Sequence, residues 1–122
     1  MKVKISTNEK FHAITVVEAH LTANMTAALH DLCEPLLKQD VKNLLLNLKD
    51  IQKMDSAAAQ AIWDLRNLFY AARASLVLCE LQPSVKKYFD QNEQFENLQI
   101  APTALEGSDI IFMEELEREF TD

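Results

Sequence analysis

The segment that decides the fold reads Leu44-Leu-Leu-Asn-Leu-Lys-Asp-Ile-Gln-Lys-Met-Asp-Ser-Ala-Ala-Ala-Gln-Ala-Ile62. It opens inside a short apolar run, residues 43–48, whose length and composition predict a central strand buried on both faces of a sheet. It closes in a helical pattern that places its apolar residues on one face: Ala58, Ala61, Ile62, Leu65, Phe69 and Ala72. Between them, Asp55 and Ser56 are both good N-cap residues, so a helix is predicted to begin at this dipeptide.

The residues before this segment predict a hairpin followed by a helix. Residues 2–6 alternate polar and apolar side chains, and residues 11–18 are rich in β-branched residues, with a turn-prone stretch at 7–9. Apolar residues at steps of three and four then predict a helix over residues 23–38. Pro35 removes one backbone hydrogen bond, so a kink or an early end is expected there.

The residues after it predict a second buried strand at 75–79, a short helix opening at Pro83, an edge strand at 98–100 and an amphipathic helix over 108–120. The order β-β-α-β-α-β-α-β-α predicts an α/β domain with a mixed sheet of about five strands and about four helices. A chain of 122 residues with 48% hydrophobic content suits one such domain over residues 1–122.

Charge and composition narrow the classes of function. The net charge is −7, and no basic stripe offsets it, so binding to nucleic acid or to an anionic membrane surface is not expected. The N-terminus lacks the apolar core of a secretory signal, and no segment is long and apolar enough to insert into a membrane, so we expect a cytoplasmic protein. Cys33 and Cys79 lie among apolar neighbours and are predicted to be reduced, buried thiols.

No catalytic, cofactor or metal site is expected, and the chain is predicted not to be an enzyme. His12, His20 and His30 lack the spacing of metal ligands. There is no G-x-S-x-G motif, and Gly107 is the only glycine, so there is no glycine-rich phosphate loop.

The strand, the Asp55-Ser56 loop and the helix start resemble the STAS domain, the SpoIIAA-like fold shared by anti-anti-sigma factors and the cytoplasmic tails of sulphate transporters. Residues 76–85 and 98–106 are similar to later segments of the same family, so the resemblance covers nearly the whole chain. It implies a domain that works by docking on another protein.

The resemblance also implies a modification site. In anti-anti-sigma factors the second residue after the aspartate is often the phosphorylated serine, and here that residue is Ala57, followed by Ala58 in place of the usual glycine. In stressosome-type relatives the acceptor directly follows the aspartate, which makes Ser56 the candidate phosphorylation site. A simple N-cap role for Asp55 and Ser56 is the alternative.

A candidate partner-binding surface follows from the helical spacing after this dipeptide. Ala59, Trp63, Arg66 and Tyr70 are predicted to share one flank of the helix, and Trp, Tyr and Arg are the residues that anchor interfaces. With Asp55, Ser56 and Ala57 at its head, this flank is the predicted docking surface, and His20 is a weaker candidate. Alternatively, Trp63 and Tyr70 cover the edge of the core beneath the neighbouring helix.

The function that the resemblance implies is that of an anti-sigma factor antagonist, which binds an anti-sigma factor or GHKL-type serine kinase and thereby frees a sigma factor. The kinase would bring the ATP, so no cofactor is expected on this chain. Two alternatives stay open: a STAS subunit of an ABC-type lipid transport complex, and a ligand-binding or scaffold module in a signalling assembly. Whether the chain forms a homodimer also stays open.

Overall fold

The computed structural model describes residues 1–121. Its strands, 3-10 helices and α-helices follow in this order: β1 (Val3–Thr7), β2 (Phe11–Val16), β3 (His20–Leu21), η1 (Ala23–Met25), α1 (Thr26–Cys33), η2 (Glu34–Lys38), β4 (Asn43–Asn47), β5 (Lys53–Met54), α2 (Ser56–Ala71), β6 (Leu76–Cys79), α3 (Pro83–Asp90), η3 (Glu93–Phe95), β7 (Gln99–Ala101) and α4 (Ala104–Thr121).

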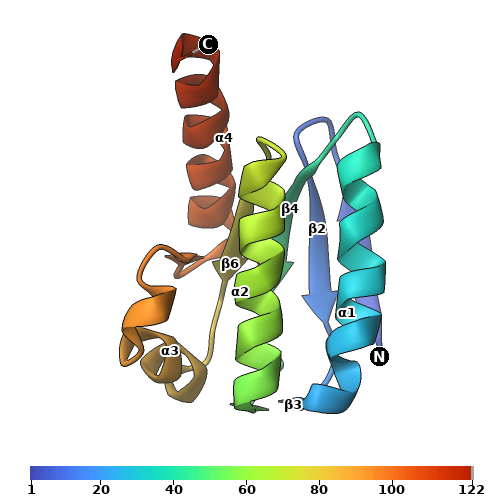
Figure 1. The fold of residues 1–122 in the computed structure, drawn as a ribbon, viewed down its shortest axis with the longest axis vertical. Helices are drawn as coiled ribbons and strands as arrows, with labels where there is room; N and C mark the ends of the chain where they lie inside the picture. Colours follow the sequence, from blue (N-terminus) through green and yellow to red (C-terminus); the bar gives the residue numbers. More distant parts are fainter. Residues whose placement is uncertain (122) are drawn as a thin grey trace.

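Five strands form one mixed sheet in the order β1-β2-β4-β6-β7. The first pair is the antiparallel hairpin, and the other three pairs are parallel, joined by crossover connections that contain the helices. As predicted, β4 lies in the middle of the sheet, between β2 and β6 (Figure 1), and β7 lies at its edge. The predicted fold class, an α/β domain with a mixed five-stranded sheet and four α-helices, is therefore confirmed.

The sheet is covered on both faces because side chains alternate along each strand. On one face, Leu44 and Leu46 of β4 join a large core with α1, α2 and α3. On the other face, Leu45 joins a smaller core with Ile111 of α4. The run of leucines in β4 is thus explained by burial on both sides.

The two long helical patterns differ in detail from the sequence expectation. The predicted helix over residues 23–38 is divided into η1, α1 and η2, and the α-helix stops before Pro35, which confirms the expected early end. The last helix begins at Ala104, four residues earlier than the apolar spacing indicates, because the Thr103 hydroxyl accepts a hydrogen bond from Glu106 N at 3.1 Å.

A second, two-stranded sheet was not predicted. β3 and β5 pair in parallel, with His20 opposite Lys53 and Leu21 opposite Met54. Strands of two residues carry no periodic signal, so sequence patterns do not reveal them. The pairing places the loop before α1 beside the loop before α2.

Cys33 and Cys79 are buried and free, as the sequence predicted. Burial raises the pKa of each thiol to about 12, which keeps both in the neutral form near neutral pH. Of the helices formed by residues 1–121, none combines the length and the apolar character that a membrane span requires.

Candidate functional site

The head of α2 is held by one carboxylate that caps two helices. Asp55 has the extended backbone of an N-cap residue, and its Oδ1 accepts a hydrogen bond from Ala58 N at 2.9 Å. Its Oδ2 accepts a second hydrogen bond, from Ala23 N at 2.8 Å in η1. Of the two candidate caps, Asp55 is therefore the N-cap, and it also ties α2 to the segment that leads into α1.

The loop before α2 is fixed by backbone hydrogen bonds to its neighbours. Gln52 N donates to Ala19 O at 2.7 Å, and Asp55 N donates to Leu21 O at 3.2 Å. On the other side, the hydroxyl of Ser84 in α3 donates to Gln52 O at 3.1 Å. The head of α2 is thus a preformed surface, which lowers the entropic cost of docking a partner there.

Ser56 is the first residue of α2, and both Ser56 and Ala57 are exposed. The backbone N–H groups of a first helical turn lack partners within the helix, and the helix dipole is positive there, so the site tolerates a negative charge. Ala58, where the family usually has glycine, is fully buried. His20 is exposed on β3 beside Lys53, at the same end of the molecule.

The flank of α2 agrees only in part with the predicted docking surface. Ala59 was expected on the surface but is fully buried, because its position falls on the side of α2 that packs into the large core. Arg66 lies over two aromatic rings, with its guanidinium carbon 5.3 Å from the Trp63 ring centre and 4.3 Å from that of Tyr70. These three side chains form the stack Trp63-Arg66-Tyr70.

The stack is half-buried and packs against neighbouring elements. Trp63 makes an edge contact with Phe95, with ring centres 6.1 Å apart. The Tyr70 hydroxyl donates a hydrogen bond to Glu114 Oε1 at 2.6 Å, and burial, followed by this bond, raises the pKa of Tyr70. The stack therefore covers an edge of the core, as the alternative interpretation held, and keeps an exposed rim.

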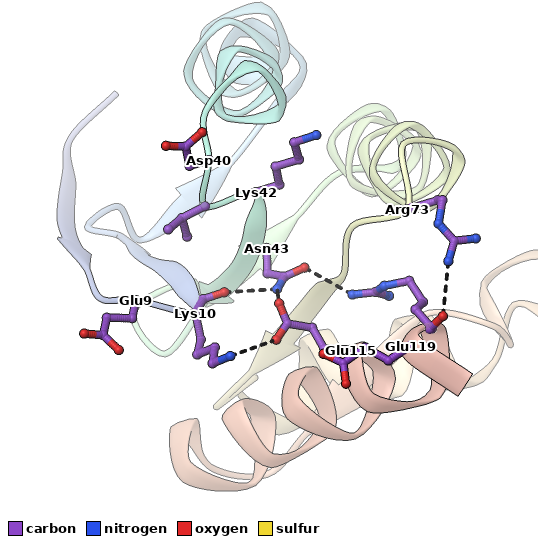
Figure 2. A pocket seen from close by; sticks show the side chains of 10 residues that line it. Glu9, Lys10, Asp40, Lys42, Asn43, Arg73, Glu115 and Glu119 are labelled. Carbon is purple, nitrogen blue, oxygen red and sulfur yellow. Dashed lines mark hydrogen bonds and ion pairs between the residues drawn. The ribbon is translucent and has the colours of Figure 1, made fainter. Parts of the chain in front are cut away.

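A polar hollow of about 440 Å³ lies at the amino ends of the strands, where sequence reasoning found no site. Figure 2 shows the side chain of Asn43 at its centre, with Lys10 and Glu115 beside it. The Glu115 carboxylate accepts a hydrogen bond from Asn43 Nδ2 at 2.7 Å and lies 3.8 Å from Lys10 Nζ. The one signal in the sequence that could have indicated this hollow is the polar side chain of Asn43 at the start of an apolar run. Since these polar groups bind one another, their contacts join α4 to the start of β4 and to the turn before β2.

Two further observations concern the chemistry of the site. Among residues 1–121, no group of three His, Cys, Asp or Glu side chains is placed to hold a metal ion. The exposed hydroxyl at the head of α2 has no capping role, since Asp55 supplies the cap. The head of α2 thus presents an exposed serine hydroxyl beside a carboxylate that is engaged in capping.

Replacing Asp55 with alanine is expected to lower the free energy of unfolding by about 2 kcal/mol, because two helix starts lose a cap. Asp55→Asn keeps one acceptor oxygen and should lose about half as much. Urea denaturation measures the difference. Asp50→Ala is the control, since no hydrogen bond or ion pair engages that carboxylate within residues 1–121. Equal stability of Asp55→Ala and the wild type would contradict the double cap.

The comparisons with known proteins agree on one family and one fold. The model of the STAS domain matches residues 3–106. The Thermotoga maritima protein TM1081, a candidate anti-sigma factor antagonist, has 12% sequence identity and a TM-score of 0.77, with 88% of this chain and 86% of that chain covered. A variant of RsbS from Moorella thermoacetica has 16% identity and a TM-score of 0.74, with 97% and 99% covered. The phosphorylated form of Bacillus SpoIIAA has 14% identity and a TM-score of 0.67, with 90% and 99% covered.

Proposed function

Because this chain belongs to the STAS domain family, we propose that it is a single-domain anti-sigma factor antagonist, which docks on a cytoplasmic anti-sigma factor of the GHKL serine kinase type. The observation that carries the proposal is the preformed head of α2, where Asp55 caps the helix and leaves Ser56 exposed. The docking surface consists of Asp55, Ser56, Ala57 and His20, with the exposed rim of Trp63 and Arg66.

We propose further that Ser56 is the residue through which docking is regulated. A phosphate there adds about −1.5 to −2 charges beside the unpaired N–H groups of the first turn, so the fold accepts it. A partner packed on the same surface meets a new charge that must be desolvated, and a loss of about a hundredfold in affinity is equivalent to about 2.7 kcal/mol.

The comparisons support this proposal at the level of the fold. SpoIIAA is an anti-sigma factor antagonist with an unphosphorylated and a phosphorylated form, and its chain resembles this one from end to end. Ala57 stands where the resemblance implies the usual acceptor, so regulation of this protein would rest on the neighbouring hydroxyl of Ser56.

The test is affinity purification of the wild type and of Ser56→Asp from the native cell, with mass spectrometry of the partners and of Ser56. We expect a GHKL-type kinase to be recovered with the wild type and with Ser56→Ala. Ser56→Asp should bind that kinase about a hundredfold more weakly when the purified proteins are titrated.

Ser6→Asp is the matched control, because Ser6 is also exposed but lies on β1. It should bind the kinase as the wild type does. If only transporter ATPase subunits were recovered, the proposal would be contradicted, and a role in lipid transport would be favoured. Failure to recover any partner whose binding depends on Ser56 would contradict the regulatory step.

A further inference from the structure

The final helix carries an apolar surface that the described chain leaves largely exposed. Among residues 1–121, eight large hydrophobic side chains are exposed, and five of them lie on α4. We name these five the outer stripe: Leu105, Phe112, Met113, Leu116 and Phe120. The exposed fractions of 74% for Leu105 and 82% for Phe120 show that both ends of the stripe are open to solvent.

Apart from Phe112, whose ring contacts Phe11 with ring centres 6.2 Å apart, the outer stripe is separate from the face that holds α4 on the sheet. The inner face packs through Gly107 and Ile111, which are buried. Phe112, Leu116 and Phe120 follow one another at steps of four residues, so they form one line along the other side of the helix. A surface helix normally needs one apolar face for its own domain, and a second such face marks an interaction site.

Both sides of the outer stripe are acidic. Glu106 and Glu117 lie on one side and Glu119 on the other; all three are exposed, and no hydrogen bond or ion pair within residues 1–121 engages their carboxylates. A hollow of about 270 Å³ opens beside the stripe, lined by Lys10, Phe112, Glu115, Leu116 and Glu119. Lys10 pairs with Glu115 in this hollow, which leaves the Glu119 carboxylate as its open acceptor.

We propose that the outer stripe binds a basic amphipathic helix of a partner protein. The apolar face of such a helix would cover the stripe, and its lysine or arginine side chains would meet the acidic borders. One of these long side chains would enter the hollow and reach Glu119. A second copy of this chain is a poorer occupant, since pairing two outer stripes brings acidic borders against each other.

This surface is distinct from the proposed kinase-docking surface. Figure 1 shows the C-terminal half of α4 at one end of the molecule and the start of α2, beside β3, at the other. The family model matches residues 3–106, so nearly all of the stripe lies beyond the matched region. The inference therefore does not depend on the proposed function, and both surfaces are open to partners at once.

The test is binding of a labelled peptide, measured by fluorescence anisotropy with the full chain. The probe is an amphipathic helix of leucine and lysine, about 18 residues long to match five turns. We expect a micromolar dissociation constant that rises with salt concentration. A glutamate version of the peptide and a scrambled leucine-lysine peptide of equal composition should not bind.

Variants of exposed residues make the test specific without endangering the fold. Leu116→Gln combined with Phe120→Gln should weaken binding at least tenfold, whereas Leu68→Gln, at an exposed leucine of α2, should leave it unchanged. Glu117→Gln combined with Glu119→Gln should reduce the salt dependence. Equal binding of the glutamate peptide would overturn the proposal. So would a dimer of the chain that Leu116→Gln dissociates, or binding to phosphatidylcholine vesicles in place of the peptide.

Discussion

Replacing Asn43 with leucine is expected to lower the free energy of unfolding by about 3 to 4 kcal/mol, although leucine has the same branched side-chain skeleton and suits the apolar run around it. The side chain of Asn43 is buried and makes hydrogen bonds to four partners in three parts of the chain. Leucine makes none of these bonds, so the buried groups that remain would lose their partners.

The four bonds join the amino ends of the strands to α4, and Figure 2 shows those to Lys10 and Glu115. The Nδ2 group donates to Lys10 O at 3.0 Å and to Glu115 at 2.7 Å. The Oδ1 atom accepts from Ser75 N at 2.8 Å and from the Arg118 guanidinium at 3.4 Å. The bond to Ser75 N is the most costly to lose, because that N–H is fully buried.

Thermal and urea denaturation of Asn43→Leu measure this effect, with an expected fall of roughly 12 °C in Tm. The control is Asn47→Leu at the other end of the same strand. The Asn47 side chain is half-buried, and within residues 1–121 it makes hydrogen bonds only to Glu80 and Lys49 N, so a loss of about 1 kcal/mol is expected. If both variants lost the same free energy of unfolding, the four hydrogen bonds of Asn43 would not be the cause of its large effect. Any asparagine in β4 would then contribute equally.

The fold could be predicted because its signals are local. The apolar run at residues 43–48 and the helix start at Asp55 and Ser56 agree with β4 and α2 to within one residue. Burial on both faces selects a continuous apolar strand, and a capping carboxylate selects a helix start, so both leave a mark in a single short segment. β3 and β5 leave none, since each exists only through pairing with the other.

The candidate site was predictable at its head and less so along the flank of α2. Asp55 and Ser56 act within one helical turn, and the structure places them as expected. Ala59 and Trp63 were assigned to the docking flank from helical spacing alone. Spacing gives the direction of a side chain around the helix, but it does not show how far the neighbouring core extends around that helix. The large core reaches Ala59, and Phe95 covers part of Trp63.

Contacts between distant segments explain what sequence reasoning missed. Asn43 and Glu115 are 72 residues apart in the sequence, so nothing near either residue indicates their hydrogen bond. The outer stripe was likewise concealed, because the expected helix over residues 108–120 was read as having one apolar face. Only the position of α4 on the sheet shows that Ile111 points inward while Leu116 points to solvent.

The two proposed surfaces depend on different parts of the fold. The head of α2 is tied to the loops at the carboxyl ends of the strands, whereas α4 is anchored through the sheet face and through Asn43. Damage at Asn43 should therefore release α4 before it disturbs Ser56. A substitution that loosens α4 is therefore expected to weaken peptide binding at the outer stripe more than it weakens partner docking at the head of α2.

That anchoring is tested most directly by Gly107→Leu, which is expected to lower the free energy of unfolding by about 3 kcal/mol. Gly107 faces the sheet, and a Cβ atom there would lie 2.6 Å from Leu45 Cδ1, 3.6 Å from Cys79 Cβ and 3.7 Å from Ala101 Cβ. Leucine favours helices more than glycine does, so the loss would come from packing and not from helix propensity. The sheet side offers no space, because Leu45 is itself buried.

A double-mutant cycle with Leu45→Ala separates this packing effect from others. Leu45→Ala alone should cost about 2 to 3 kcal/mol through the cavity it leaves. In the double variant the new leucine fills part of that cavity, so the combined loss should fall below the sum of the single losses by about 1 kcal/mol or more. Strict additivity would mean that Gly107 does not set how closely α4 approaches the sheet. The leucine at position 107 would then have to be accommodated by a shift of the whole helix, and Phe112 would lose its contact with Phe11, whose ring centre lies 6.2 Å away.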